Sequence, residues 1–159
     1  MEFDRLLQRL LDHKIDFVLI GGFAAVLHGA VVVTQDVDVC LSFTRENLDR
    51  FAAALADLHP VHRLTPNQLP FGISDANWQS LRNIYLKTDW GILDCLGEVA
   101  GIGDYQRAYA ASTVVALPIG ECRVLTIEAL IRAKETIARP HDLRTVSALK
   151  AILSKRKHG

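Results

Sequence analysis

The chain has 159 residues, of which half are hydrophobic and 23% are charged, and its formal net charge is zero. A chain of this length can bury one substantial core, so we expect a single domain, 1–159, made of a sheet-containing core, 1–125, and a C-terminal helical element, 126–159. Zero net charge argues against a general nucleic-acid binder, which carries a basic excess.

The first third of the chain alternates helical and strand patterns. Apolar residues at helical spacing, together with capping signals, predict helices over residues 3–14, 23–29 and 45–58. Apolar runs predict strands over residues 16–20 and 36–43. Gly21-Gly22 ends the first strand, Gly29 closes the second helix, and Thr44 is the predicted N-cap of the third.

Neither a membrane span nor an export signal is expected. Three glycines and a histidine interrupt the most apolar region, residues 18–33, which falls short of the roughly 18 consecutive apolar residues of a membrane helix. The chain opens with acids among leucines, whereas a secretory signal has a basic start and an unbroken apolar core. Cys40, Cys95 and Cys122 each lie in apolar sequence without disulfide or zinc spacing, so we expect reduced core thiols in a cytoplasmic protein.

The rest of the chain continues the alternation after a segment, residues 59–83, that is rich in proline and predicts a loop with one or two strands. Strands are predicted over residues 84–87, 92–96, 113–117 and 122–125. Helices are predicted over residues 105–111, 127–138 and 141–153, with Thr126 and Pro140 at two of their N-termini. The fold class is therefore α/β (α+β), with a mixed sheet flanked by helices.

Two aspartates, Asp36 and Asp38, lie two apart in the strand pattern TQDVDVCL. At this spacing both side chains project from one face, with Cα atoms about 7 Å apart. Their carboxylates could then converge on two cations about 3.5 to 4 Å apart. Asp94, a lone acid in the apolar run ILDCL, is the candidate third carboxylate. A D-x-D pair taken alone is more often a strand end or a cap.

Gly21-Gly22 joins a buried strand to a helix N-terminus, where backbone N–H groups and the helix dipole can receive a phosphate. Glycine also lets a phosphate approach the backbone closely. Tight strand-to-helix turns use glycine for steric reasons as well, so both interpretations of the pair stand.

Taken together, I20-G21-G22, thirteen intervening residues, D36-V37-D38-V39 and a later apolar-flanked acid resemble the nucleotidyltransferase superfamily with the polymerase-beta-type fold. A narrower resemblance is to the small bacterial branch related to AbiEii-type abortive-infection toxins. It is carried by His28-Gly29, by T-x-D-V-D at residues 34–38 and by L-T-x-E-x-L-I-x-x-K-x-x-x-x-R-P-x-D at residues 125–142. Relatives often carry an arginine three residues after the glycine of HG, where this chain has Val32.

The resemblance implies a metal-dependent transfer of a nucleoside monophosphate from a nucleoside triphosphate (NTP), such as ATP, to an acceptor hydroxyl. Mg²⁺ or Mn²⁺ would be held by three acids, Asp36, Asp38 and Asp94, which would be the catalytic centre. The nucleotide would be held by Gly21, Gly22 and Thr34. The acceptor remains open between a tRNA end, a protein hydroxyl and a small antibiotic-like alcohol.

Charge is unevenly spread along the neutral chain. Residues 132–159 carry eight Lys and Arg against two acids, a net charge of +6, so the first 131 residues carry −6. Lys134 could reach a phosphate of the nucleotide as a point charge, and Arg139 could grip two phosphate oxygens. Solvated charges near helix ends explain both residues equally well, and we expect the extreme end, SKRKHG, to be solvated.

A rival interpretation from another class is a weakly active or inactive binding subunit, for example a partner protein in a bacterial defence or toxin–antitoxin operon. Retention of all three acids favours the enzyme. Val32 and the short chain, which leaves little room for a separate acceptor-binding domain, favour the rival.

Overall fold

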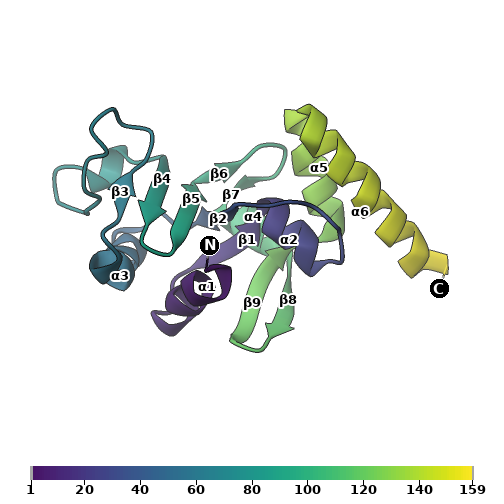
Figure 1. Cartoon of the computed structure of the whole chain (residues 1–159), viewed down its shortest axis with the longest axis horizontal. Coiled ribbons are helices and arrows are strands. Elements are labelled where there is room, and N and C mark those ends of the chain that lie inside the picture. The colour runs from purple at the N-terminus through teal and green to yellow at the C-terminus, as the bar shows by residue number, and fades with distance from the viewer. Residues whose placement is uncertain (1, 159) are drawn as a thin grey trace.

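The computed structural model describes residues 2–158, and its centre is a seven-stranded mixed sheet with the strand order β3-β4-β5-β2-β1-β9-β8 (Figure 1). Its strands are β1 (Phe17–Ile20), β2 (Asp36–Leu41), β3 (Val61–His62), β4 (Asn83–Thr88), β5 (Gly91–Leu96), β8 (Ser112–Leu117) and β9 (Gly120–Leu125). A separate two-stranded pair consists of β6 (Glu98–Val99) and β7 (Gly103–Asp104). The predicted α/β class with a mixed sheet is confirmed.

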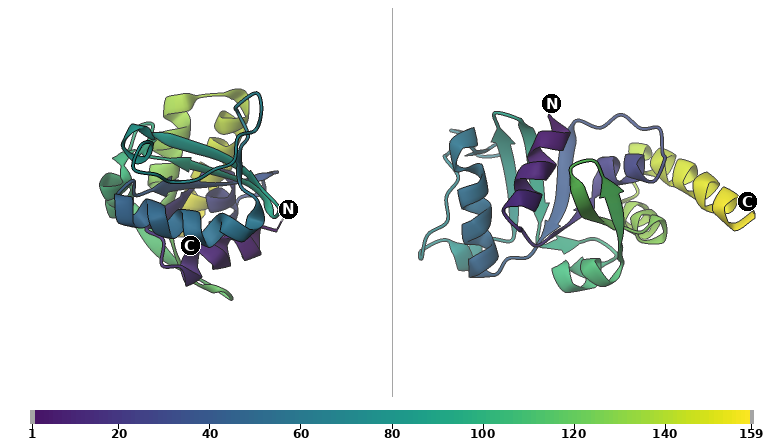
Figure 2. Two further views of the ribbon diagram at one scale, coloured as in Figure 1. Left: turned by 90° about the vertical axis from the view of Figure 1, so that its left-hand side faces the viewer. Right: turned by 90° about the horizontal axis from the view of Figure 1, so that it is seen from below.

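Helices flank this sheet. They are α1 (Phe3–Asp12), α2 (Gly21–Leu27), α3 (Arg45–Leu55), α4 (Tyr105–Ala110), α5 (Ile127–Ile137) and α6 (Pro140–His158), with short 3₁₀ turns η1 (Ala56–Leu58) and η2 (Trp78–Ser80). Helices α1 and α3 lie side by side (Figure 2), while α5 and α6 pack together beyond α2, and α6 carries the C-terminal end away from the sheet (Figure 1).

Most predicted boundaries differ from the structure by a few residues, and two of the differences have a clear physical cause. Helix α2 begins at Gly21 and not at residue 23, because Gly21 adopts a left-handed φ of +74° that turns the chain directly from β1 into the helix. Helix α6 continues to His158, beyond the predicted end at residue 153, because the basic end has good helix formers and no glycine or proline before residue 159. Residues 154–158 of the predicted solvated end are exposed, although Arg156 Nη2 donates to the carbonyl of His28 at 3.3 Å, and residue 159 lies outside the described residues.

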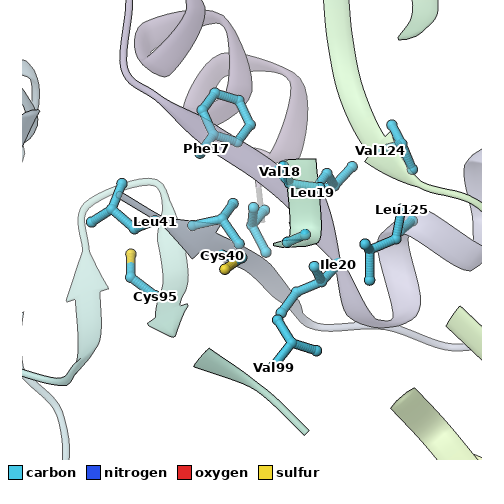
Figure 3. Packing of buried hydrophobic residues seen from close by; sticks show 14 of the residues in the cluster. Phe17, Val18, Leu19, Ile20, Cys40, Leu41, Cys95, Val99, Val124 and Leu125 are labelled. Atoms are coloured by element: carbon cyan, nitrogen blue, oxygen red, sulfur yellow. The ribbon is translucent and has the colours of Figure 1, made fainter. Parts of the chain in front are cut away.

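The hydrophobic core is built around β1, all four residues of which are buried. Strand β1 has a neighbouring strand on each side and no face exposed to solvent. It therefore needs no alternating polar residues, which explains the continuous apolar run FVLI. Figure 3 shows this packing together with Cys40, Cys95 and Leu125. The three cysteines are buried and free, as the prediction of core thiols required.

Strand pairing brings distant parts of the sequence to one level of the sheet. Strand β1 pairs antiparallel with β2, which places Ile20 opposite Asp38. Strand β2 pairs parallel with β5, which places Asp38 opposite Asp94. The turn into α2 and both aspartates therefore meet at the same edge of the molecule.

Local hydrogen bonds hold this arrangement at its ends. Thr126 caps α5 by accepting from the N–H of Ala129 at 3.1 Å, as predicted. The ring Nε2 of buried His28, just after α2, lies 2.7 Å from the carbonyl oxygen of Leu125, just before α5. The His28-Gly29 motif thus joins α2 to the start of α5.

Among the residues described, no helix combines the length and the apolar composition needed to cross a membrane. The proline-rich segment 59–83 contains one short strand, β3, and the turn η2, in agreement with the predicted loop containing a strand or two.

Asn47 clamps the ends of β1 and β2 that lie farthest from the aspartates. Its fully buried side chain accepts from the N–H of Asp16 at 2.8 Å and donates to the carbonyls of Asp16 and Ser42 at 3.0 and 2.8 Å.

We predict that Asn47→Ala lowers the free energy of unfolding by about 2 to 4 kcal/mol, because it leaves buried backbone groups unpaired. Urea denaturation measures this, and exposed Gln106→Ala should change stability by less than about 0.5 kcal/mol. Equal effects of the two changes would contradict the clamp.

Candidate active site

Three carboxylates meet where β2 and β5 run side by side. Asp36, Asp38 and Asp94 each offer an oxygen, and these oxygens all lie within 4.8 Å of one another. Asp94 is buried, while the other two are partly exposed. The structure therefore brings together the three acids that the sequence singled out, although they come from strands more than fifty residues apart in the chain.

The glycine pair gives the carboxylates room. A Cβ atom at position 21 would overlap the Asp38 carboxylate and lie 2.9 Å from its Cβ, closer than such atoms approach. A Cβ atom at position 22 would lie 3.2 Å from both Cβ and Oγ1 of Thr34. Gly21 is thus required by the acid itself and by its left-handed φ, whereas Gly22 keeps the turn close to Thr34.

A cleft of about 1050 Å³ opens over the three acids. One side is formed by the β1–α2 turn and the segment 31–36, the opposite side by β4, β5 and β6, and the end by α5 and the start of α6. All eight residues predicted for the site line it, namely Gly21, Gly22, Thr34, Asp36, Asp38, Asp94, Lys134 and Arg139. Val32 lines it too, while Val31 and Val33 beside it are 97% and 94% exposed.

Lys134 and Arg139 both contact the buried side chain of Asp142. Lys134 Nζ lies 3.8 Å from Asp142 Oδ1, and Arg139 Nε donates to Oδ2 at 2.7 Å. The Asp142 side chain is only 1% exposed and that of Lys134 12%, whereas that of Arg139 is 58% exposed. Asp142 therefore contacts both a largely shielded lysine and an arginine that is nearer the surface.

The sequence analysis missed Arg63. Its guanidinium grips Asp94 with two hydrogen bonds, Nε to Oδ1 at 2.9 Å and Nη2 to Oδ2 at 2.6 Å. Arg63 lies in the segment 59–83, where prolines obscure any periodicity, and its partner is 31 residues away. No local signal distinguishes it from a surface arginine of a loop.

Burial and crowding of like charges disturb the ionisation of the site. Burial raises the pKa of Asp38 to about 6, with further increases from the charges of Asp94 and Asp36, against the opposing charges of Lys134 and Arg63. Burial and Asp94 also raise the pKa of Asp36. The pKa of Lys134 is lowered by its burial, although Asp142 and Asp38 oppose this. The acids thus repel one another, and two nearby cations relieve that repulsion only in part.

This donor set fits divalent cations. Carboxylate oxygens are the ligands that Mg²⁺ takes in phosphate-handling sites, and three of them converge here on rigid strands. Two cations about 3.5 to 4 Å apart would need carboxylates that both ions can share. The grouping of the three oxygens within 4.8 Å of one another allows this.

Comparison with solved structures places this geometry in a known fold. LnuA, a lincosamide antibiotic adenylyltransferase with lincomycin bound, superposes with a TM-score of 0.63 over 95% of this chain and 96% of its own, at 16% identity. ANT(2″)-Ia in complex with adenylyl-2″-tobramycin gives 0.61 over 99% and 92%, at 14% identity. The chain has a nucleotidyltransferase fold.

A third neighbour is a nucleotidyltransferase-like protein from Paracoccidioides brasiliensis, with a TM-score of 0.57 over 92% of this chain and 72% of its own, at 16% identity. No protein-family model matches the chain, and no curated protein does. At such low identities the similarity shows the fold, and chemistry has to be argued from the site.

The raised pKa of Asp38 leads to a pH-dependent stability prediction. The folded protein releases this proton near pH 6 and the unfolded chain near 3.8, so folding becomes less favourable as pH rises through this interval. With a metal chelator present, the free energy of unfolding of Asp38→Asn should therefore exceed that of the wild type by about 1 to 3 kcal/mol at pH 7.5. At pH 4 the two values should be nearly equal.

Urea denaturation at the two pH values measures the difference. Asp75→Asn, at a position whose side chain is 98% exposed, is the matched control and should show no such pH dependence. A wild type that is as stable as the Asp38→Asn protein at pH 7.5 would show that Asp38 is not strained by its neighbours.

Proposed function

We propose that this protein is a metal-dependent nucleotidyltransferase, which moves a nucleoside monophosphate from an NTP to an acceptor hydroxyl. The observation that carries the proposal is the convergence of Asp36, Asp38 and Asp94 beside a glycine turn and a largely shielded lysine, inside one cleft. The fold shared with adenylyltransferases that modify antibiotics supports the same reaction class. As in the sequence-based expectation, the acceptor could be a tRNA end, a protein hydroxyl or a small alcohol.

The proposed roles follow from position. The three acids would hold Mg²⁺ or Mn²⁺, which would neutralise phosphate charge and favour ionisation of the attacking hydroxyl. Asp94 lines the cleft from β5, on the side of β4, and would orient the acceptor hydroxyl. Gly21 and Gly22 would let the triphosphate approach the backbone at the start of α2, with Thr34 beside them.

Lys134 is the proposed phosphate-binding cation. It belongs to α5, lies close enough to Asp38 for their charges to interact, and is shielded from solvent by its position against Asp142. A shielded ammonium attracts a phosphate more strongly than an exposed one, because water screens it less. Arg139, held by the same aspartate at the cleft end, would add a second donor to the phosphates.

The proposal includes the narrower resemblance to AbiEii-type toxins, because the residues that carry it include the proposed phosphate-binding cations. The run of residues 125–142 that carries this resemblance places Lys134, Arg139 and Asp142 together at the cleft end. A function in a bacterial defence or toxin–antitoxin system, with a partner protein from the same operon, is the corresponding biological proposal.

A second candidate function is that of a weakly active or inactive binding subunit. It is favoured by Val32, which presents an apolar side chain to the cleft where relatives carry an arginine, and by the two exposed valines beside it. An apolar rim next to an acidic centre suits protein contact better than phosphate binding.

Label transfer decides between the two candidates. Purified protein is incubated with each α-labelled NTP, Mg²⁺ or Mn²⁺ and a cell extract, and labelled RNA, protein and small molecules are then separated. Labelled product that is lost in Asp36→Asn, Asp38→Asn supports the enzyme and gives the acceptor class. Absence of labelled product with every NTP and both metals would contradict the enzyme and favour the binding subunit.

The same double change should abolish binding of Mn²⁺ in the presence of a non-hydrolysable NTP analogue. The reason is that only one of the three carboxylates, Asp94, would remain, and a single carboxylate holds a divalent cation weakly. Isothermal titration calorimetry measures the binding. Unchanged Mn²⁺ binding would place the metal elsewhere.

Lys134→Ala should weaken NTP binding by roughly tenfold to a hundredfold, the loss expected for one charge-assisted contact of about 1.5 to 3 kcal/mol. Lys150→Ala is the matched control, because this exposed lysine of α6 pairs with Glu135. A nucleoside without phosphates should bind both variants equally. If the control loses as much NTP affinity as Lys134→Ala, the phosphate contact has been assigned to the wrong lysine.

A further inference from the structure

Arg63 belongs to a row of residues that crosses the sheet. It follows directly after β3, and its backbone N–H donates to the carbonyl of Tyr85 at 3.0 Å. Tyr85 is paired with Asp94 across β4 and β5, and Asp94 is paired with Asp38 across β5 and β2. The backbone of the sheet therefore holds Arg63 level with two of the three acids.

The guanidinium takes both oxygens of Asp94, through hydrogen bonds of 2.9 and 2.6 Å. The side chains are 27% and 10% exposed, so the pair is largely shielded from water. Parallel hydrogen bonds between a planar fork and a carboxylate are among the strongest polar contacts in proteins. The guanidinium carbon also lies 5.5 Å from the centre of the Tyr85 ring, which adds a weaker contact on one side.

A divalent cation would have to use the same carboxylate. One Asp94 oxygen belongs to the group of ligand atoms within 4.8 Å of one another, and the Arg63 fork bonds to both Asp94 oxygens. A cation at Asp94 would also lie beside the positive guanidinium in a shielded site, where like charges repel more than they do in water. Among the described residues, 2–158, neither the Asp36 nor the Asp38 side chain forms a hydrogen bond or an ion pair with a lysine or arginine side chain, so this competition is specific to the third acid.

We propose that Arg63 is a positioning residue and the built-in counter-ion of Asp94, which competes with a divalent cation for this carboxylate. Metal alone is then bound chiefly by Asp36 and Asp38, and full use of Asp94 depends on a triphosphate, whose negative charges offset the guanidinium. The role of the triphosphate rests on the proposed nucleotidyltransferase function. The competition itself concerns only Arg63, Asp94 and the cation.

Mn²⁺ binding tests the competition without any turnover. Electron paramagnetic resonance of free Mn²⁺ is measured during titration of the wild type and of Arg63→Gln. The variant should bind Mn²⁺ at least about fivefold more tightly, because it removes a like charge and frees both carboxylate oxygens. With a non-hydrolysable ATP analogue present, the gain should fall below about twofold. Arg45→Gln is the control, because Arg45 pairs with Asp49 and Asp75 on the surface, and it should bind Mn²⁺ as the wild type does.

Two further variants make the result specific to the pair. Arg63→Lys retains the charge but not the fork, so its Mn²⁺ affinity should lie between those of the wild type and Arg63→Gln. In an Asp94→Asn background, Arg63→Gln should give less than half of its gain, since the carboxylate in dispute is gone. If Arg63→Gln does not fold, as judged by circular dichroism, Arg63→Lys carries the test, and the absence of any gain overturns the proposal.

Mn²⁺ binding that is unchanged or weakened in Arg63→Gln would also overturn it, because Arg63 would then serve to hold Asp94 in place for the metal. This failure differs from a failure of the proposed function. Label transfer by the wild type tests the function, and it can succeed when the Mn²⁺ titrations show no competition. Conversely, competition for Mn²⁺ can be observed in a protein that transfers no nucleotide.

Discussion

The repulsion among Asp36, Asp38 and Asp94 is the constraint around which this end of the molecule is arranged. Parallel pairing of β2 with β5 sets two of the acids side by side, and their oxygens lie within 4.8 Å of those of the third. Carboxylates this close and this shielded cannot all ionise freely, which the raised pKa of Asp38 reflects. The neighbouring cations lessen that cost from opposite sides, Lys134 near Asp38 and Arg63 on Asp94. Gly21 leaves the space in which the Asp38 carboxylate lies.

The basic excess of residues 132–159 contributes less to the cleft than its net charge of +6 suggests. Asp142 is one of the two acids in this segment, and it is buried against Lys134 and Arg139, so part of their charge is already compensated within the protein. The basic residues at the end of α6 extend away from the sheet (Figure 1). Position on the helices, and not composition, therefore determines which charges a nucleotide would meet.

The sequence was sufficient for the features that depend on local pattern. The D-x-D spacing placed two acids on one strand face, the apolar run around Asp94 placed it in a strand, and Thr44 and Thr126 cap their helices as expected. Features that depend on strand order were out of reach. The level at which Arg63 meets Asp94 follows from the pairing of β3 with β4 and of β4 with β5, and the sequence carries no mark of that register. The short β6–β7 pair was missed for a similar reason, because two-residue strands have no periodicity.

The β3–β4 edge of the sheet, next to Asp94, is the part of the cleft whose residues can vary most without disturbing the core. The part of the sheet that carries Gly21 and Asp38 lies in the centre and is bounded by buried strands, so substitutions there disturb the core. The β3–β4 side lies at the sheet edge, and its two strands are joined by the irregular part of the segment 59–83, which can change without loss of the core. An acceptor approaching Asp94 from that side meets the Arg63–Asp94 ion pair and the Tyr85 ring, a surface without the net negative charge that would attract a polycation. In the proposed reaction, this edge would therefore face the acceptor, and the centre of the sheet would face the nucleotide.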